Sequence, residues 1–167
     1  QPPTQEYLAP KTTVRVGLVQ WQMRSYKTLD DLFEQVEFFV DHVSDYKSDF
    51  VLFPEYFNAP LMSKYNDKGE SQAIRGLAQY TEEIRDRFIN LAISYNINII
   101  TGSMPLIKED GLLYNAGFLC RRDGTYEMYE KLHVTPDEIK SWGLSGGKQL
   151  KTFETDCAKI GILICYD

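Results

Sequence analysis

Three residues with reactive side chains are Glu55, Lys131 and Cys165. Each follows a segment that is largely apolar or in which polar and apolar residues alternate. A thiol becomes a nucleophile when a base removes its proton and a nearby positive charge favours the thiolate. A carboxylate and an ammonium group can supply both functions without a histidine. The sequence therefore indicates nucleophilic catalysis by a cysteine, provided that folding brings these residues together.

Each of the three residues also has an ordinary structural interpretation. Cys165 follows the apolar residues 160–164, and a buried cysteine often acts as a small hydrophobic residue. Lys131 could be an exposed lysine at the end of a strand. Glu55 could be a solvated acid in a turn, but the aromatic residues around it in 53–57 favour a general base. The residue types alone leave both interpretations open.

The remaining cysteines and histidines do not indicate a second catalytic site or a metal site. Cys120 and Cys157 lack comparable reactive neighbours, so we expect them to be structural. Three cysteines are an odd number without the spacing of a zinc site, which favours a reducing cytoplasmic compartment and no metal. With only His42 and His133 in the chain, a histidine-based triad is not expected.

The surrounding pattern predicts strands and helices that would hold these residues at strand ends. Apolar runs predict strands at residues 14–20, 49–53 and 97–102. Helical spacing predicts helices that begin at Thr28 and Thr81. Hairpin patterns pair 112–121 with 125–131, and 151–154 with 159–164. Helices alternate with strands and then strands dominate, which is typical of a layered α/β or α+β sheet protein.

Two segments lack a periodic pattern. Residues 1–12 contain three prolines and predict a linker or an extended arm. Residues 58–72 are polar and predict a surface loop. Residue 1 is Gln, and the chain stops directly after an apolar run, so we expect it to be part of a longer polypeptide.

Composition excludes several classes of protein. The chain has 167 residues, 43% hydrophobic and 25% charged, as in an ordinary globular domain. Its 11 Tyr and 9 Phe argue against disorder. The net charge of −6 argues against nucleic acid as a partner. No apolar run reaches the roughly 18 residues that a membrane span needs.

Three segments resemble the signature segments of the nitrilase superfamily, in the same order. They are Phe53-Pro-Glu-Tyr-Phe57, Tyr129-Glu-Lys-Leu-His133 and Gly161-Ile-Leu-Ile-Cys-Tyr-Asp167. Four further segments, around residues 14–23, 94–100, 132–138 and 155–157, resemble the branch in which such a domain follows a GNAT-type acetyltransferase domain. That branch would place an acetyltransferase upstream of the proline-rich arm.

The resemblance implies an α+β fold, a four-layer αββα sandwich, of which residues 13–167 would form the N-terminal portion. It implies hydrolysis of non-peptide C–N bonds without metal or cofactor. Cys165 would be the nucleophile, Glu55 the general base and Lys131 the group that stabilises the tetrahedral intermediate. The backbone N–H of Tyr166 would help to form the oxyanion hole. Glu138 matches a second glutamate that positions the site, although an acid at the start of a helix explains it equally well.

The expected substrate is a small linear amide or a carbamoyl compound, and the expected assembly is a homodimer or a higher homo-oligomer. Domains of this family are usually well over 250 residues, so we expect this chain to be the N-terminal portion of a longer domain. Two alternatives to hydrolysis therefore stay open. The chain could be a non-catalytic binding module or inactive fragment, or the intact domain could transfer the acyl group to an amine.

Overall fold

A computed structural model describes residues 13–20, 22, 24–65, 67–165 and 167. Its centre is a sheet of seven strands. They are β1 (Val16–Leu18), β2 (Phe50–Leu52), β3 (Asn98–Ile100), β4 (Met104–Ile107), β5 (Leu113–Cys120), β6 (Tyr126–Glu130) and β7 (Leu144–Ser145). The predicted arm, residues 1–12, lies outside the described residues.

The sheet is parallel in its first half and antiparallel in its second half. β1, β2 and β3 run parallel to one another. β5 is the long central strand, antiparallel to β3, β4 and β6 and parallel to β7. All eight residues of β5 are buried. A buried central strand is a rigid platform for any side chain that points toward a site at the edge of the sheet.

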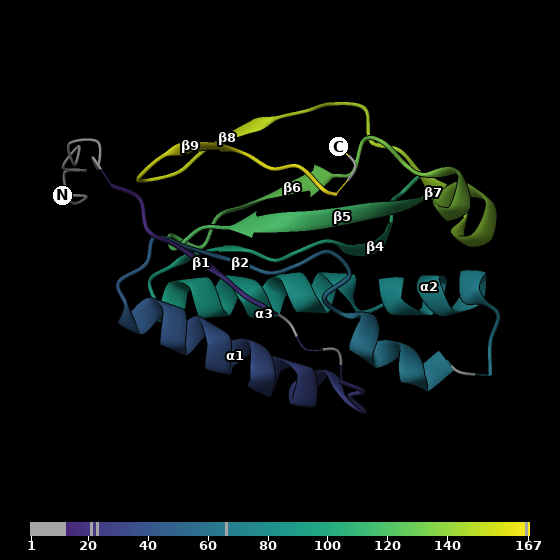
Figure 1. The fold of residues 1–167 in the computed structure, drawn as a ribbon, viewed down its shortest axis with the longest axis horizontal. Helices are drawn as coiled ribbons and strands as arrows, with labels where there is room; N and C mark the ends of the chain where they lie inside the picture. The colour runs from purple at the N-terminus through teal and green to yellow at the C-terminus, as the bar shows by residue number, and fades with distance from the viewer. Residues whose placement is uncertain (1–12, 21, 23, 66, 166) are drawn as a thin grey trace.

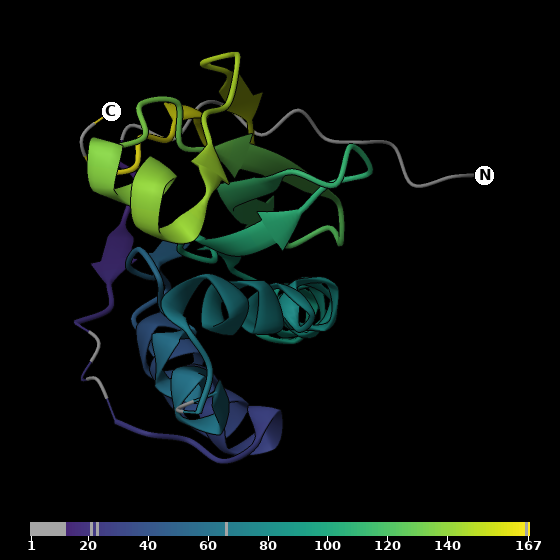
Figure 2. The same ribbon diagram turned by 90° about the vertical axis from the view of Figure 1, so that its right-hand side faces the viewer.

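Three helices cover one face of the sheet (Figures 1 and 2). They are α1 (Leu29–Asp45), α2 (Glu70–Ala78) and α3 (Thr81–Ser94). Apolar side chains from one face of α1 and α3 pack against the sheet, among them Val36, Val40 and Phe88, which are fully buried. The hydrophobic faces of these helices therefore form the larger core.

The opposite face of the sheet is covered by a two-stranded hairpin (Figure 2). The hairpin consists of β8 (Thr152–Glu154) and β9 (Lys159–Gly161). Phe153 and Ile164 pack there against Phe50, Leu119 and Tyr129 of the main sheet. The expected four-layer sandwich is thus present in part, as a helix layer, a full sheet and two strands of a second sheet. No helix covers the second sheet within the described part of the chain.

Several predicted elements match the structure closely. The hydroxyl of Thr28 accepts a hydrogen bond from the N–H of Asp31 and caps α1, as its position predicts. The helix predicted from Thr81 is α3, and both predicted hairpins form. The strands are shorter than predicted. In particular, β9 ends at Gly161, so Cys165 lies in a turn beyond the strand and not at its tip.

The prediction of a surface loop at 58–72 is wrong. Residues Ala59–Tyr65 form a 3-10 helix, and α2 begins at Glu70. Leu61 is fully buried in the core. The segment as a whole is polar in composition, and this single buried apolar residue was therefore overlooked. The sequence also gave no signal for β4. None of the helices in the described residues is long and apolar enough to cross a membrane.

Candidate active site

Glu55 lies in the turn directly after β2. Tyr56, the next residue, has a positive φ of 51°, which a residue with a side chain adopts rarely. Gly102, just beyond β3, packs against this turn with a φ of 71°. A Cβ on Gly102 would lie 2.1 Å from the carbonyl oxygen of Pro54. Only glycine permits this approach, so the ends of β2 and β3 fix the position of the carboxylate together.

Lys131 is the first residue after β6, and its main chain is held on both sides. Its N–H donates to the carbonyl oxygen of Asn115, and its own carbonyl accepts from the N–H of Gly147, both at 2.9 Å. Its side chain is only 2% exposed. A buried ammonium group is costly unless it is paired, so its partners are part of the architecture.

Two carboxylates share this buried ammonium group. The Nζ of Lys131 lies 2.8 Å from Oε1 of Glu138 and 3.6 Å from Oε1 of Glu55. Burial alone would lower the pKa of Lys131. The hydrogen bond to Glu138 and the charges of Glu55, Glu138 and Cys165 outweigh burial and raise the pKa. Lys131 is therefore a fixed positive charge at neutral pH.

Glu138 begins a short π-helical turn, Glu138–Trp142. Its Oε1 accepts from the hydroxyl of Thr135 at 3.0 Å, while its own N–H donates to that hydroxyl at 3.3 Å. This reciprocal pair resembles a capping box. The same oxygen binds Lys131, so Glu138 both starts a helical turn and holds the lysine.

Tyr56 closes this cluster on one side. Its hydroxyl is buried, and its ring packs edge-on against Trp142 with 5.6 Å between the ring centroids. Burial, reinforced by the charges of Glu138 and Glu55, raises the pKa of Tyr56 well above its ordinary value. Tyr56 is therefore a neutral phenol.

Cys165 is exposed and faces the same region. Its φ of 46° lies in the left-handed region, which is uncommon for a residue with a side chain. Cys165, Glu55, Ser103 and Tyr129 are among the residues that line one small cavity of about 170 Å³. The hydroxyl oxygen of Ser103 is buried there without a hydrogen-bond partner among the described residues. The structure thus brings the predicted nucleophile and base to one cavity, and the base also lies beside the ammonium group of Lys131.

Asp167 connects the turn of Cys165 to the segment of Lys131, a role that was not predicted from the sequence. Its side chain is 2% exposed. Its carboxylate accepts from the N–H groups of Leu132 at 3.1 Å, His133 at 2.8 Å and Ile164 at 3.3 Å. The chain end accordingly lies beside the segment that follows β6 (Figure 1). The only signal was an acid two residues after the cysteine in the third segment.

The other candidates fall into three groups. Tyr166, the predicted source of an oxyanion-hole N–H, lies outside the described residues. Cys120 is fully buried, and burial raises its pKa to about 12. Burial also raises the pKa of Cys157. His133 is mostly exposed at the rim, with Nδ1 3.4 Å from Asp167. In the described part of the chain, no group of three or more His, Cys, Asp or Glu residues could hold a metal ion.

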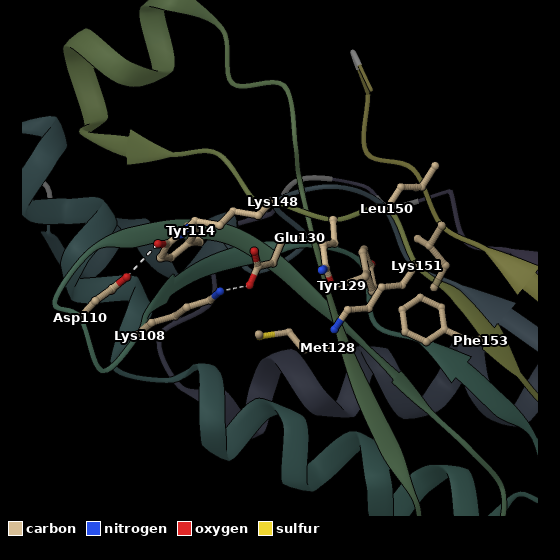
Figure 3. Close-up of a pocket in the computed structure, with 12 residues that line it drawn as sticks. Lys108, Asp110, Tyr114, Met128, Tyr129, Glu130, Lys148, Leu150, Lys151 and Phe153 are labelled. Carbon is tan, nitrogen blue, oxygen red and sulfur yellow. Dashed lines mark hydrogen bonds and ion pairs between the residues drawn. The ribbon is translucent and has the colours of Figure 1, made fainter.

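Figure 3 shows a second, larger hollow of about 350 Å³. It lies next to the Cys165 cavity and shares Tyr129 and Ile162 with it. Glu130 pairs there with Lys108. This hollow contains none of the three predicted catalytic residues. The small cavity, not the large hollow, is therefore the candidate active site.

Comparison with known proteins decides the family. A family model for carbon-nitrogen hydrolases matches residues 15–167. The chain belongs to the carbon-nitrogen hydrolase family. This chain is 44% identical over 164 residues to the "Probable hydrolase YhcX" of Bacillus subtilis (strain 168), and the alignment covers 98% of this chain and 32% of that protein. It is 31% identical to the "Omega-amidase NIT2" of Homo sapiens, covering 93% of this chain and 56% of that protein.

Solved structures of a nitrilase-superfamily member and of an amidase share the fold. Nit3 of Saccharomyces cerevisiae, a member of branch 10 of the nitrilase superfamily, aligns with a TM-score of 0.74 at 22% identity. That alignment covers 92% of this chain and 55% of Nit3. An amidase from Nesterenkonia sp. aligns with a TM-score of 0.73 at 18% identity, over 92% of this chain and 56% of the amidase. The chain thus spans from 32% to 56% of the length of these four relatives.

Proposed function

We propose that this chain carries the catalytic residues of a thiol-dependent amidase that cleaves a small linear amide or a carbamoyl compound. The observation that supports this proposal is the shared geometry of Glu55, Lys131 and Cys165. A buried lysine lies between two carboxylates, and one of these carboxylates lines a cavity together with an exposed cysteine. A purely structural ion pair would need neither the cysteine nor the cavity.

In the acylation step, Glu55 accepts the thiol proton as the sulfur of Cys165 attacks the carbonyl carbon. The carbonyl π electrons move to the oxygen, which becomes an oxyanion. An ammonium group has three N–H donors. One of those on Lys131 binds Glu138 and another faces Glu55, so the third can stabilise the oxyanion. The C–N bond then breaks, and protonated Glu55 returns its proton to the leaving nitrogen.

In the deacylation step, Glu55 takes a proton from water as the water oxygen attacks the thioester. The C–S bond breaks, the thiolate of Cys165 recovers the proton from Glu55, and a carboxylic acid leaves. The charge balance at the site suits this cycle. Glu138 offsets the charge of Lys131, which leaves Glu55 as the carboxylate that can accept a proton.

Two relatives support the substrate class. The human relative is named an omega-amidase. A variant of the Nesterenkonia amidase, aligned at a TM-score of 0.71, shows covalent addition of the acetamide moiety of fluoroacetamide at the active site cysteine. By analogy, the sulfur of Cys165 would form the covalent bond to a short amide substrate.

The test is ammonia release from a panel of short linear amides and N-carbamoyl amino acids by the purified protein. Replacing Cys165 with Ala should abolish release, and replacing Glu55 with Gln should reduce it by at least about 10³-fold, because the base is lost. Unchanged release by the Cys165→Ala variant would rule out the thiol mechanism. A protein that releases ammonia from no member of the panel would refute the proposed activity.

A further inference from the structure

We propose that Asn115 is a positioning residue. It orients the carboxylate of Glu55 so that Oε2, and not Oε1, accepts the thiol proton. This inference rests on the proposed function and names how its base is held. Asn115 is the third residue of β5 and is 1% exposed. Its Nδ2 donates to Oε1 of Glu55 at 2.9 Å.

The same residue also holds the lysine, through its main chain. The carbonyl oxygen of Asn115 accepts from the N–H of Lys131 at 2.9 Å. One residue of a fully buried strand therefore sets the position of the base through its side chain and the position of the cation through its backbone. Glu55 and Lys131 come from different turns, and Asn115 is where both turns are anchored to the sheet.

The hydrogen bond distinguishes the two oxygens of Glu55. Oε1 carries the bond from Asn115 and faces Lys131 at 3.6 Å. Among the described residues, no hydrogen bond reaches Oε2. Without Asn115, the carboxylate could rotate and approach the ammonium group more closely, and a carboxylate in a tight ion pair is a poorer base. Asn115 thus keeps Oε2 available for the proton of Cys165.

The amide of Asn115 is itself only half satisfied. Its Oδ1 is buried and has no hydrogen-bond partner among the described residues. Leaving a buried carbonyl oxygen unpaired is unfavourable, and a side chain kept for stability alone would have both ends paired. The one strong contact of this amide is the charged one to Glu55, so the contact to the base explains why an amide stands at this position.

The experiment is a double-mutant cycle that measures the rate at which iodoacetamide alkylates Cys165, followed by peptide mass spectrometry at neutral pH. Asn115→Ala should slow alkylation by about 10- to 100-fold, as expected for the loss of one hydrogen bond to a charged group. Glu55→Gln should slow it at least as much. In the Glu55→Gln background, Asn115→Ala should have almost no further effect, because the group that it orients is gone.

The matched control is Thr81→Ala. Thr81, the first residue of α3, is fully buried, and its hydroxyl donates to the carbonyl oxygen of Pro105 at 2.6 Å, away from the hairpin and from Glu55. This variant should lose comparable thermal stability while Cys165 alkylates at the native rate. If Asn115→Ala does not fold, Asn115→Asp replaces it. An acid beside Glu55 should move the rise of the alkylation rate to higher pH, since like charges favour protonation.

The outcomes separate the two claims. If Glu55→Gln leaves the alkylation rate unchanged, Glu55 is not the base and the proposed function fails with this inference. If Glu55→Gln slows alkylation but Asn115→Ala or Asn115→Asp does not, only the role of Asn115 is wrong. If Asn115→Ala costs the same factor with and without Glu55, it acts through general structure, and the positioning role is contradicted.

Discussion

At the scale of single residues, the main feature of the site is a charged group that is buried away from water. Lys131 is almost fully buried, which alone would favour its neutral form, yet two carboxylates keep it charged. Its pKa is raised, so the ion pairs contribute to stability below the ordinary pKa of 10.5 and are lost as the pH rises through the folded value. At neutral pH, Lys131 can therefore stabilise negative charge but cannot act as the base.

The three cysteines should differ sharply in reactivity. Cys120 is fully buried with a pKa of about 12, and burial also raises the pKa of Cys157, whereas Cys165 is exposed. At pH 7.5, about one equivalent of iodoacetamide should therefore label Cys165 first, at least about 10-fold faster than Cys157. Labelling of Cys157 should increase only at more alkaline pH, and Cys120 should stay unlabelled in the folded protein.

Peptide mapping over a pH series measures this order directly, with the unfolded protein in denaturant as the control in which all three cysteines react. Equal labelling of Cys157 and Cys165 in the folded protein would show that Cys165 has no special environment.

Residue types in the sequence predicted the members of the site but not their supports. Glu55, Lys131, Cys165 and Glu138 stand in recognisable segments, and the structure places the first two and Glu138 in direct contact. The contact of Asn115 with Glu55 joins residues 60 positions apart in the chain. The local sequence pattern of β5 does not distinguish an asparagine that binds a catalytic base from an asparagine that is buried for structural reasons. The contact of Asn115 with Glu55 could therefore not be predicted.

At the scale of elements, the site is assembled from three turns that follow three strands. The turns follow β2, β6 and β9, and each is fixed by a contact to a different part of the chain. The approach of Gly102 to Pro54 fixes the first turn, and Asp167 joins the second turn to the third. Strand ends were predictable from the apolar runs, whereas the distance of Cys165 from β9 was not, because a turn with a positive φ leaves no periodic signal.

The carboxylate of Asp167 should be essential to the nucleophile turn. Asp167→Ala removes an acceptor of three main-chain N–H groups, including those of Leu132 and Ile164. We expect the free energy of unfolding to fall by about 1.5–3 kcal/mol, the usual contribution of hydrogen bonds to a charged group. Alkylation of Cys165 should also slow by about 10-fold or more, because the turn is no longer held.

The control is Asp123→Ala, which removes an acid that accepts from the N–H of Thr125 in the β5–β6 turn. It should lower the thermal midpoint without slowing Cys165 alkylation. A normal alkylation rate in Asp167→Ala, measured on the folded fraction, would mean that Asp167 does not position the cysteine.

At the scale of the whole molecule, the hairpin determines whether the nucleophile meets its base. Glu55 and Lys131 follow strands of the main sheet, while Cys165 follows the hairpin on the opposite side from the helices (Figures 1 and 2). Phe153 and Ile164 pack on the sheet, and Arg122 pairs with Asp156 at 2.8 Å near the hairpin turn. The layered α/β class was predictable from the alternation of patterns. The docking of the hairpin was not, because it depends on contacts between segments with unrelated local patterns.

The most direct test of the central claim is the mass of the protein during turnover. The protein is mixed with butyramide, quenched with acid within milliseconds to seconds, and measured intact and after peptide mapping. The proposed mechanism predicts a mass increase of one butyryl group on the peptide that contains Cys165, its decay as butyrate appears, and no such species in Cys165→Ala. Ammonia release without that adduct, or with an adduct on another residue, would contradict the assignment of Cys165 as the nucleophile.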